Sequence, residues 1–508
     1  MNDQATQPLL IVSADGHVTP PPAAVGEYLE AQYHEPWLAR YHEENAEWVE
    51  GLDYLVFSDE VLELIDKEHR IRTQGDLGWE LDRRLQEMDD EGIAAELLLA
   101  GVFAAASPFF TCANREYPAD VRRAGIRAYH RWVADFMAAS DGRMFGVALP
   151  GPCLDLDDAV AELHWVAAHG FRSVAVPGII KDPVLPPLWD DYYEPFWRAC
   201  AELDLVLSVH ASHGRVQGEF IPYVQKVYAL LAERGEEATP ARVQSAMSNG
   251  EVPGSPFAPD FVPQEVLFQL IVGGVFDRHP DLRIAFTEVR SDWVPAVLAN
   301  FDARFDAGDL PAARRPSEYW AERCYAGASS IKASEIRLRH EIGVDRLMFG
   351  RDYPHAEGTW PNTFDWLRTA FDGVPEDEAR AILGENAVRC YDLDAAKLRA
   401  VAARIGPRPA DLLGRAADVD PALVENFSTR GGYGKSMEHP DVGALNARRP
   451  GSALIDGADQ LLNWPGCNST GASNSTRAPP TRRRHRRRGR ARRERWPACA
   501  RPGRVRGS

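Results

Sequence analysis

Eight short apolar runs are spaced along the first 350 residues of this chain, and most are followed by a stretch of helical composition. Repeated strand–helix units indicate an α/β fold with a parallel sheet. Eight units favour a TIM-type (β/α)8 barrel, with an open doubly wound sheet as the second choice. The predicted strands are Leu9–Ala14, Ala95–Ala100, Met144–Leu149, Ser173–Val176, Leu205–Val209, Arg283–Thr287, Cys324–Ala326 and Leu347–Phe349. The clearest predicted helices are Trp79–Glu91, Pro118–Ser140, Leu156–His169 and Tyr192–Glu202.

Several segments elaborate the barrel, which we expect to occupy residues 1–393. Residues 18–78 predict a cap over its mouth, and residues 215–263 predict an insertion in the fifth unit. Both follow the C-terminal end of a strand, where the loops of such barrels surround the active site. Residues 394–464 predict a helical C-terminal extension. Residues 465–508 are rich in Ser, Asn, Gly, Pro and Arg, a composition that predicts a disordered tail.

The formal charge of −18 conceals a strong asymmetry, because residues 477–508 hold fourteen arginines and only one glutamate. The acidic remainder of the chain opposes nonspecific binding to nucleic acid. The arginine run has three interpretations: an electrostatic contact with nucleic acid or another acidic surface, a localisation signal, or a non-native end read out of frame. We favour the last and do not expect nucleic acid as a partner.

The N-terminus shows no basic segment followed by an apolar one, and no apolar run approaches 18 residues. These features predict neither secretion nor a membrane span. The seven cysteines are far apart and form no CxxC pair, a pattern typical of reduced thiols in a cytoplasmic protein.

Polar residues that can bind a metal or exchange protons follow several of the apolar runs. Asp15 and His17 come directly after the first strand, and residues i and i+2 of a strand point to the same side. The pair can share a divalent metal at the mouth of the barrel. Alternatively, Asp15 caps a turn and His17 lies on the surface.

His210 ends the fifth strand and His213 follows three residues later. A neutral imidazole is the commonest metal ligand, and the second histidine can serve as an acid or base. The alternative for His210 is a hydrogen-bonded core residue. Glu288 ends the sixth strand, where it can bind the metal directly or orient a ligand.

Asp352 follows the last strand and a glycine, and an aromatic–proline turn then exposes His355. An Asp at this place can bind a metal and take a proton from a water molecule. The alternative is a helix-capping role for Asp352. We expect His355 to be a second acid or base.

Arg290 and Arg351 flank the expected ligands. Their guanidinium groups can clamp a substrate carboxylate through two hydrogen bonds. They can equally well neutralise the local carboxylates.

In this order the motifs resemble those of the amidohydrolase-related family that includes aminocarboxymuconate semialdehyde decarboxylase and the aromatic-acid decarboxylases. The resemblance covers roughly residues 9–393. It rests on Asp15-x-His17, Arg84-Leu85-x-x-Met88-Asp89-x-x-Gly92-Ile93, Gly170-Phe171, His210, Glu288 with Trp293, Gly350-x-Asp352-Tyr353-Pro354-His355 with Glu357-Gly358, and Gly384-Glu385-Asn386-Ala387. Three positions depart from the common family pattern, and the first is Asp15, because the strand-one motif is often His-x-His. Glu288 stands where many relatives have histidine, and Arg351 where serine is common.

The resemblance implies a barrel that holds one divalent metal ion, Zn or Mn, with Asp15, His17, His210 and Asp352 as ligands and Glu288 as a replacement for a histidine ligand. It also implies a small carboxylated substrate and, by default, a homodimer. It favours a non-oxidative decarboxylase of a cyclic or aromatic-derived acid. A hydrolase that uses activated water is the alternative, and a catalytically inactive barrel tethered to nucleic acid by the arginine tail is the remote one.

Overall fold

A computed structural model describes residues 7–20, 22–37, 39, 78–101, 118–178, 184–211, 213, 220–238, 246, 261–355, 358–421 and 423–424. Most of the predicted cap (18–78), most of the predicted insertion (215–263), the later part of the extension and the whole arginine-rich tail therefore lie outside the described residues. The domain boundaries stay predictions.

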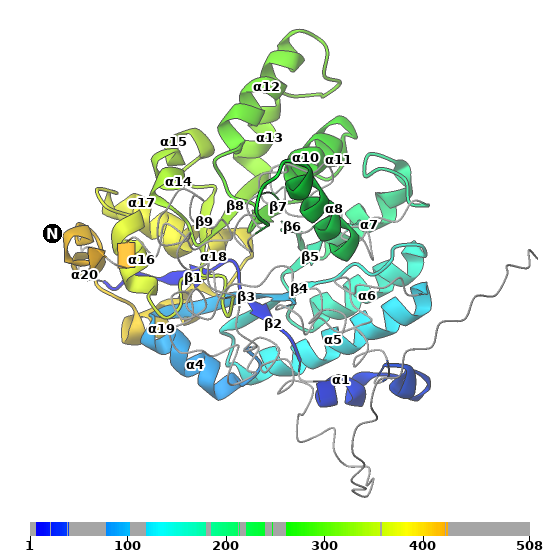
Figure 1. Cartoon of the computed structure of the whole chain (residues 1–508), viewed down its shortest axis with the longest axis horizontal. Helices are drawn as coiled ribbons and strands as arrows, with labels where there is room; N and C mark the ends of the chain where they lie inside the picture. The colour runs from blue at the N-terminus through cyan, green and yellow to red at the C-terminus, as the bar shows by residue number, and fades with distance from the viewer. Residues whose placement is uncertain are drawn as a thin grey trace, which may run out of the picture.

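Parallel strands form a nearly closed barrel at the centre of the molecule, with helices around it (Figure 1). The strands are β1 (Ile11–Ser13), β2 (His17–Val18), β3 (Ile93–Ala100), β4 (Met144–Ala148), β5 (Ser173–Ala175), β6 (Val206–His210), β7 (Ile284–Thr287), β8 (Cys324–Ser329) and β9 (Leu347–Gly350). Their order is β1-β3-β4-β5-β6-β7-β8-β9, and β2 also pairs with β3. All eight predicted strands are present, the first as β1, and the short strand β2 was not predicted. The predicted (β/α)8 barrel is confirmed.

The barrel closes where the first strand meets the last. The amide of Ala14 donates to the carbonyl of Phe349 at 2.8 Å, and the amide of His17 donates to the carbonyl of Tyr353 at 2.6 Å. Between them, Gly16 and Tyr353 form a parallel bridge. This seam brings residues from the beginning and from the end of the barrel's sequence into direct contact.

The helices account for most of the remaining described chain. They are α1 (Pro22–Tyr28), α4 (Leu81–Asp90), α5 (Ala119–Ala139), α6 (Leu156–Ala168), α7 (Glu194–Glu202), α8 (Phe220–Glu233), α10 (Phe261–Val272), α11 (Val275–Arg278), α12 (Val294–Asp306), α13 (Pro316–Arg323), α14 (Ala333–Arg337), α15 (Arg339–Ile342), α16 (Thr363–Ala370), α17 (Glu376–Arg380), α18 (Asn386–Cys390), α19 (Ala395–Ile405) and α20 (Pro409–Leu412). The four predicted helices correspond to α4, α5, α6 and α7. Within the described part of the chain, no helix combines the length and the apolar character that crossing a bilayer requires.

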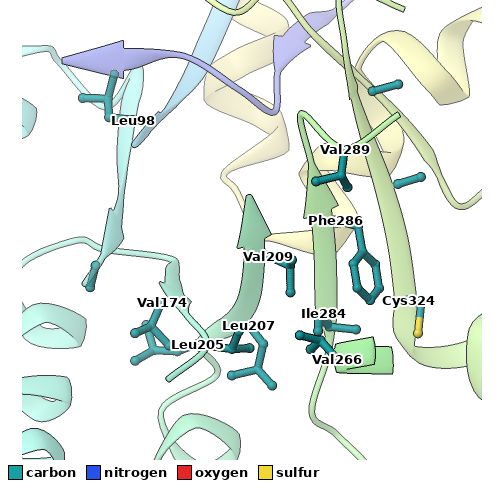
Figure 2. Close-up of a cluster of buried hydrophobic side chains, with 14 of the residues drawn as sticks. Leu98, Val174, Leu205, Leu207, Val209, Val266, Ile284, Phe286, Val289 and Cys324 are labelled. Atoms are coloured by element: carbon teal, nitrogen blue, oxygen red, sulfur yellow. The ribbon is translucent and has the colours of Figure 1, made fainter. Parts of the chain in front are cut away.

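Alternating side chains of the strands divide the core into two layers. In β6, Leu207 and Val209 belong to the layer between strands and helices, whereas Val206 belongs to the barrel interior. Figure 2 draws part of the outer layer, where Val209 and Phe286 project from neighbouring strands. The alternation places the last residue of β6, His210, on the interior side.

The interior layer also includes residues of the helices after the last strand. Leu398 and Val401 of α19 pack in one cluster with Ala94 and Ala95 at the start of β3. The start of a parallel strand marks the N-terminal end of the barrel, so α19 covers that end. The opposite end carries the polar residues.

Candidate metal centre

Five predicted ligands meet at the C-terminal ends of the barrel strands. Nε2 of His17 lies 3.6 Å from Oδ1 of Asp15, 3.5 Å from Oε2 of Glu288 and 3.3 Å from Oδ1 of Asp352. Nε2 of His210 lies 2.8 Å from Oε2 of Glu288 and 3.4 Å from Oδ1 of Asp15. The chain thus gathers three carboxylates and two imidazoles from four separate segments.

The donor atoms approach one another without the geometry of hydrogen bonds. Among the five predicted ligands, six buried atoms have no hydrogen-bond partner within the described part of the chain: Oδ1 of Asp15, both ring nitrogens of His17, Nε2 of His210, Oε2 of Glu288 and Oδ1 of Asp352. Buried polar atoms without partners are rare in folded proteins and require an explanation. A cation bound among these atoms would provide one.

Two overlapping groups of four residues have the spacing of a metal site. Asp15, His17, His210 and Glu288 form one group, and His17, Glu288, Asp352 and His355 form the other. In each group the ligand atoms lie within 4.8 Å of one another. The donor set therefore fits a divalent ion, and His355, predicted as an acid or base, lies directly beside the five predicted ligands.

Local backbone conformation directs two of the carboxylates. Glu288 and Asp352 have φ angles of 53° and 57°, in the left-handed region that side chains other than glycine seldom adopt. Thr287, just before Glu288, points to the barrel interior together with Ala285, so simple alternation would turn Glu288 outward. We attribute the inward direction of Glu288 to its left-handed backbone.

The carboxylates and imidazoles of the site shift one another's pKa values. Burial lowers the pKa of His210, but the carboxylates of Glu288 and Asp15 outweigh burial and hold that pKa well above its ordinary value. Burial raises the pKa of Glu288, but His210 and His17 outweigh burial and hold that pKa well below its ordinary value. A proton on His210 thus partly balances the carboxylates in the metal-free protein, where a cation would compete with it.

The two predicted acid–base histidines lie in different surroundings. The ring of His355 stacks on that of His17 at 4.1 Å, and its Nδ1 lies 2.9 Å from Oδ1 of Asp352. The amide of His213 donates to the carbonyl of His210 at 3.1 Å. Burial, with a smaller effect of the charge on His210, lowers the pKa of His213 to about 4. His213 is therefore a neutral imidazole near pH 7, and the structure does not include it in either group of metal-binding residues.

Arg351 is not placed to clamp a substrate, and this part of the prediction is wrong. Its side chain is fully buried, with Nε 2.7 Å from Oε1 of Glu96 and Nη1 3.0 Å from Oε2 of Glu91. The alternative expectation, that the arginine neutralises local carboxylates, describes its position. Arg290 is partly exposed and pairs with Asp292 at 2.6 Å, so its role in substrate binding stays a prediction.

Sequence reasoning did not assign a role to Glu96, which stands in the middle of the apolar strand β3. A carboxylate in a fully buried strand is costly unless it is paired and hydrogen-bonded. That signal, a lone glutamate inside Ile93–Ala100, predicts buried basic partners, which the structure identifies as Arg84 and Arg351.

The sequence matches the amidohydrolase family over residues 14–393. The chain belongs to this family. No curated protein matches the sequence of this amidohydrolase.

Several solved structures share its fold. An amidohydrolase from Mycobacterium avium subsp. paratuberculosis K-10 is 17% identical, with a TM-score of 0.54 over 76% of this chain and 99% of that chain. 5-Carboxyvanillate decarboxylase from Sphingomonas paucimobilis is 17% identical, with a TM-score of 0.51 over 76% of this chain and 100% of that chain. Dihydroxybenzoic acid decarboxylase from Polaromonas sp. JS666, with bound manganese and the inhibitor 2-nitroresorcinol, is 18% identical, with a TM-score of 0.50 over 76% of this chain and 98% of that chain. At these identities the likeness establishes the fold of this amidohydrolase.

Proposed function

We propose that this amidohydrolase is a metal-dependent, non-oxidative decarboxylase of a small cyclic or aromatic-derived carboxylic acid. The observation that carries the proposal is the convergence of Asp15, His17, His210, Glu288 and Asp352, whose unpartnered donor atoms point at one another at the mouth of the barrel. Loops at this end of a (β/α)8 barrel carry the active site in characterised enzymes of this fold.

These five residues would hold one divalent ion. Carboxylate ligands suit manganese, whereas zinc accepts nitrogen, sulfur and oxygen donors. Three carboxylates and two imidazoles therefore favour Mn over Zn. When bound, such an ion supplies positive charge that orients the oxygens of the substrate and stabilises the charge that develops as the reaction proceeds.

Side chains of the protein would hold and transfer the proton that the substrate carbon takes up. In decarboxylation the bond between the carboxylate and the substrate carbon breaks, CO2 leaves, and the electron pair left on that carbon takes a proton. Asp352 and His355, 2.9 Å apart, are placed to hold and deliver that proton. His213, neutral and buried beside His210, would orient a substrate oxygen through a hydrogen bond. Arg290 would face the substrate's outer carboxylate or hydroxyl groups.

Hydrolysis is the alternative, because the same residues would also serve an attacking water. Asp352 would then accept a proton from that water rather than deliver one to carbon. The likeness of fold to 5-carboxyvanillate and dihydroxybenzoic acid decarboxylases supports decarboxylation.

The first test combines metal analysis with turnover. The Mn²⁺-loaded protein and the variant Asp352→Asn are incubated with a panel of hydroxylated aromatic acids, and with esters, lactones and amides of similar size. We expect about one equivalent of metal in the wild type, CO2 release from at least one acid, and a loss of turnover of at least about 100-fold in the variant, as for removal of a general acid or base. Asp141→Asn is the matched control, because Asp141 also has a left-handed backbone (φ 53°) but lies exposed beside Lys397.

Turnover of an ester, lactone or amide without CO2 release would replace the decarboxylase by the hydrolase. Absence of bound Mn²⁺ and Zn²⁺ after reconstitution would refute both.

A further inference from the structure

Four charged side chains are buried between the barrel wall and α4, outside the metal centre. Arg84, Glu96 and Arg351 are 0% exposed, and Glu91 is 5% exposed. In β3, Ala95 and Leu97 face the barrel interior and Leu98 faces the helices. The alternation places Glu96 with Leu98 on the outer face of the wall, behind the seam between the first and last strands.

Glu96 is the centre of this cluster. Its Oε2 accepts hydrogen bonds from Nε and Nη2 of Arg84 at 2.9 and 2.6 Å, and its Oε1 accepts one from Nε of Arg351 at 2.7 Å. Burial raises the pKa of Glu96, but the charges of Arg351 and Arg84 outweigh burial and leave that pKa below its ordinary value. The formal charges of the two arginines and two glutamates cancel.

Two further donors of the cluster reach the backbone that carries the metal-site residues or a side chain bonded to it. Nη1 of Arg84 donates to the carbonyl of His17 at 2.6 Å. Arg351 immediately precedes Asp352, and its amide donates to Oγ of Ser13 at 2.9 Å. The hydroxyl of Ser13 in turn donates to the carbonyl of Asp15 at 2.5 Å. Three metal-site residues are thus tied through their own or adjacent peptide groups to one buried cluster.

Glu96 also packs directly against the segment between Asp15 and His17. A Cβ atom on Gly16 would lie 2.6 Å from Oε1 of Glu96, closer than real Cβ contacts. The cluster therefore restricts the segment sterically as well as through hydrogen bonds.

We propose that Ser13, Arg84, Glu96 and Arg351 are positioning residues that hold Asp15, His17 and Asp352 at the spacing needed to bind a divalent ion. This inference rests on the proposed metal centre. Groups that orient metal ligands through hydrogen bonds commonly change metal affinity 10- to 100-fold when they are removed. A cluster that served stability alone would leave affinity unchanged in variants that still fold.

The test measures metal affinity in the full chain, loaded with Mn²⁺ and titrated with a competing chelator. Ser13→Ala removes the hydroxyl that joins Arg351 to Asp15 and changes the packing little. Arg84→Lys keeps the positive charge but removes the guanidinium fork that holds Glu96 and His17 together. The electron paramagnetic resonance spectrum of bound Mn²⁺ provides a second readout, because it responds to ligand geometry and not to stability.

Each variant has a matched control, a residue of the same type that lies at the N-terminal end of a strand and not at the end that carries the metal centre. Ser173→Ala removes a buried hydroxyl, at the start of β5, that donates to the carbonyl of Val206 at 2.7 Å. Arg143→Lys removes a guanidinium group that pairs with Asp89 at 2.6 Å and binds the carbonyl of Ile93 at 2.8 Å, at the start of β3. Both controls alter buried side-chain contacts at the N-terminal ends of strands, whereas the metal centre lies at the C-terminal ends.

We expect Ser13→Ala and Arg84→Lys to lower the affinity for Mn²⁺ about 10- to 100-fold and to change the spectrum of the bound ion, with both controls within about twofold of wild type. Unchanged affinity and spectrum in Ser13→Ala, and in Arg84→Lys if it folds, would overturn the positioning role while leaving the proposed function intact. Equal losses in the controls would also overturn it, because general destabilisation would then explain the effect. A wild type that binds no Mn²⁺ would remove the positioning role together with the proposed function.

Discussion

Gly16 illustrates how much one residue decides in this site. It separates Asp15 from His17, its carbonyl accepts from the amide of Leu99 at 2.8 Å, and its missing side chain leaves room for Glu96. A larger residue would force either the Asp15–His17 segment or Glu96 to move. Glu96 has little freedom to do so, because its carboxylate already binds two arginines.

We therefore expect Gly16→Ala to lower both the stability and the affinity for Mn²⁺, the latter about 10-fold or more. Gly26→Ala in α1 is the control, since apart from its chain neighbours and the backbone of its own helix no described atom lies within 4 Å of the added methyl group. Chelator competition and thermal unfolding of both variants provide the comparison. Normal affinity in Gly16→Ala would mean that the site tolerates a shift of this segment.

Removing the carboxylate of Glu96 should lower the free energy of unfolding more than removing any single uncharged contact would. Glu96→Gln leaves two buried guanidinium groups with one remaining carboxylate partner, Glu91. Breaking a buried ion pair by removing one partner typically costs about 3–5 kcal/mol. Chemical denaturation measures this change, with exposed Glu322→Gln, which pairs with Arg314, as the control at about 0–1 kcal/mol. Equal values for the two variants would contradict the burial argument.

At the scale of single residues, sequence reasoning succeeded where position alone carries the information. His210, Glu288 and Asp352 each follow an apolar run, so the parallel strands bring them to one edge. The two interpretations of Arg351 stayed equal because a sequence does not show which carboxylate an arginine meets, and Glu96 lies more than 250 residues earlier. The left-handed backbone at Glu288 has no sequence signal of its own.

At the scale of elements, α5, α6 and β4 are joined through one histidine. Nε2 of His130 in α5 accepts from the amide of Leu149 at 3.0 Å, so that nitrogen carries no proton. Its Nδ1 therefore donates to Oε1 of Glu162 in α6, at 2.8 Å. Burial lowers the pKa of His130, which agrees with a neutral ring.

Glu162 should make the contact between α5 and α6 weaker at acidic pH. Burial raises its pKa, but the hydrogen bonds from His130 and Arg131 outweigh burial and lower that pKa to about 2. A lowered folded-state pKa contributes stability that is present above the unfolded value near 4.5 and is lost as the pH falls toward 2. We expect the difference in unfolding free energy between wild type and Glu162→Gln to be constant above about pH 5.5 and to shrink below it. A difference independent of pH from 6 to 3 would contradict this cause.

Element boundaries were predicted best where apolar residues are dense. The predicted and observed ends of β7 agree at Thr287, because the run before it is uninterrupted. Strand β8 continues to Ser329, beyond the predicted end at Ala326, since Gly-Ala-Ser carries little strand signal although its backbone pairs with β9. The short strand β2 also escaped prediction, because the interruption between β1 and β2 at Asp15 and Gly16 is set by contacts across the seam.

At the scale of the whole molecule, metal removal should lower stability. Three carboxylates held together repel one another, and an ion that binds only the folded state adds about 2.7 kcal/mol at a concentration 100 times its dissociation constant. We expect the melting temperature to fall after chelation and to recover with Mn²⁺ in the wild type and in Asp141→Asn. Asp352→Ala should recover less. A melting temperature independent of Mn²⁺ in the wild type would argue against a site that exists only in the folded protein.

The arginine-rich tail offers a second test at this scale. All the residues proposed for the site lie between Ser13 and His355, so we expect deletion of residues 465–508 to leave Mn²⁺ affinity and turnover within about twofold of the full chain. Binding to DNA is measured in parallel at two salt concentrations, since tail-dependent binding would weaken as salt rises. Loss of turnover on deletion would show that the tail contributes to catalysis.

The seam between the first and last strands has a consequence for biosynthesis. Asp15 and Asp352 are more than 330 residues apart, which corresponds to roughly 15–70 s of translation at 5–20 residues per second. During that interval a nascent chain contains at most four of the five proposed ligands, and the carboxylate of Glu96 lacks its ion pair with Arg351. The complete set of proposed ligands thus forms late, and a ribosome that stops before the last strand releases a product without Asp352 and without the arginine that pairs with Glu96.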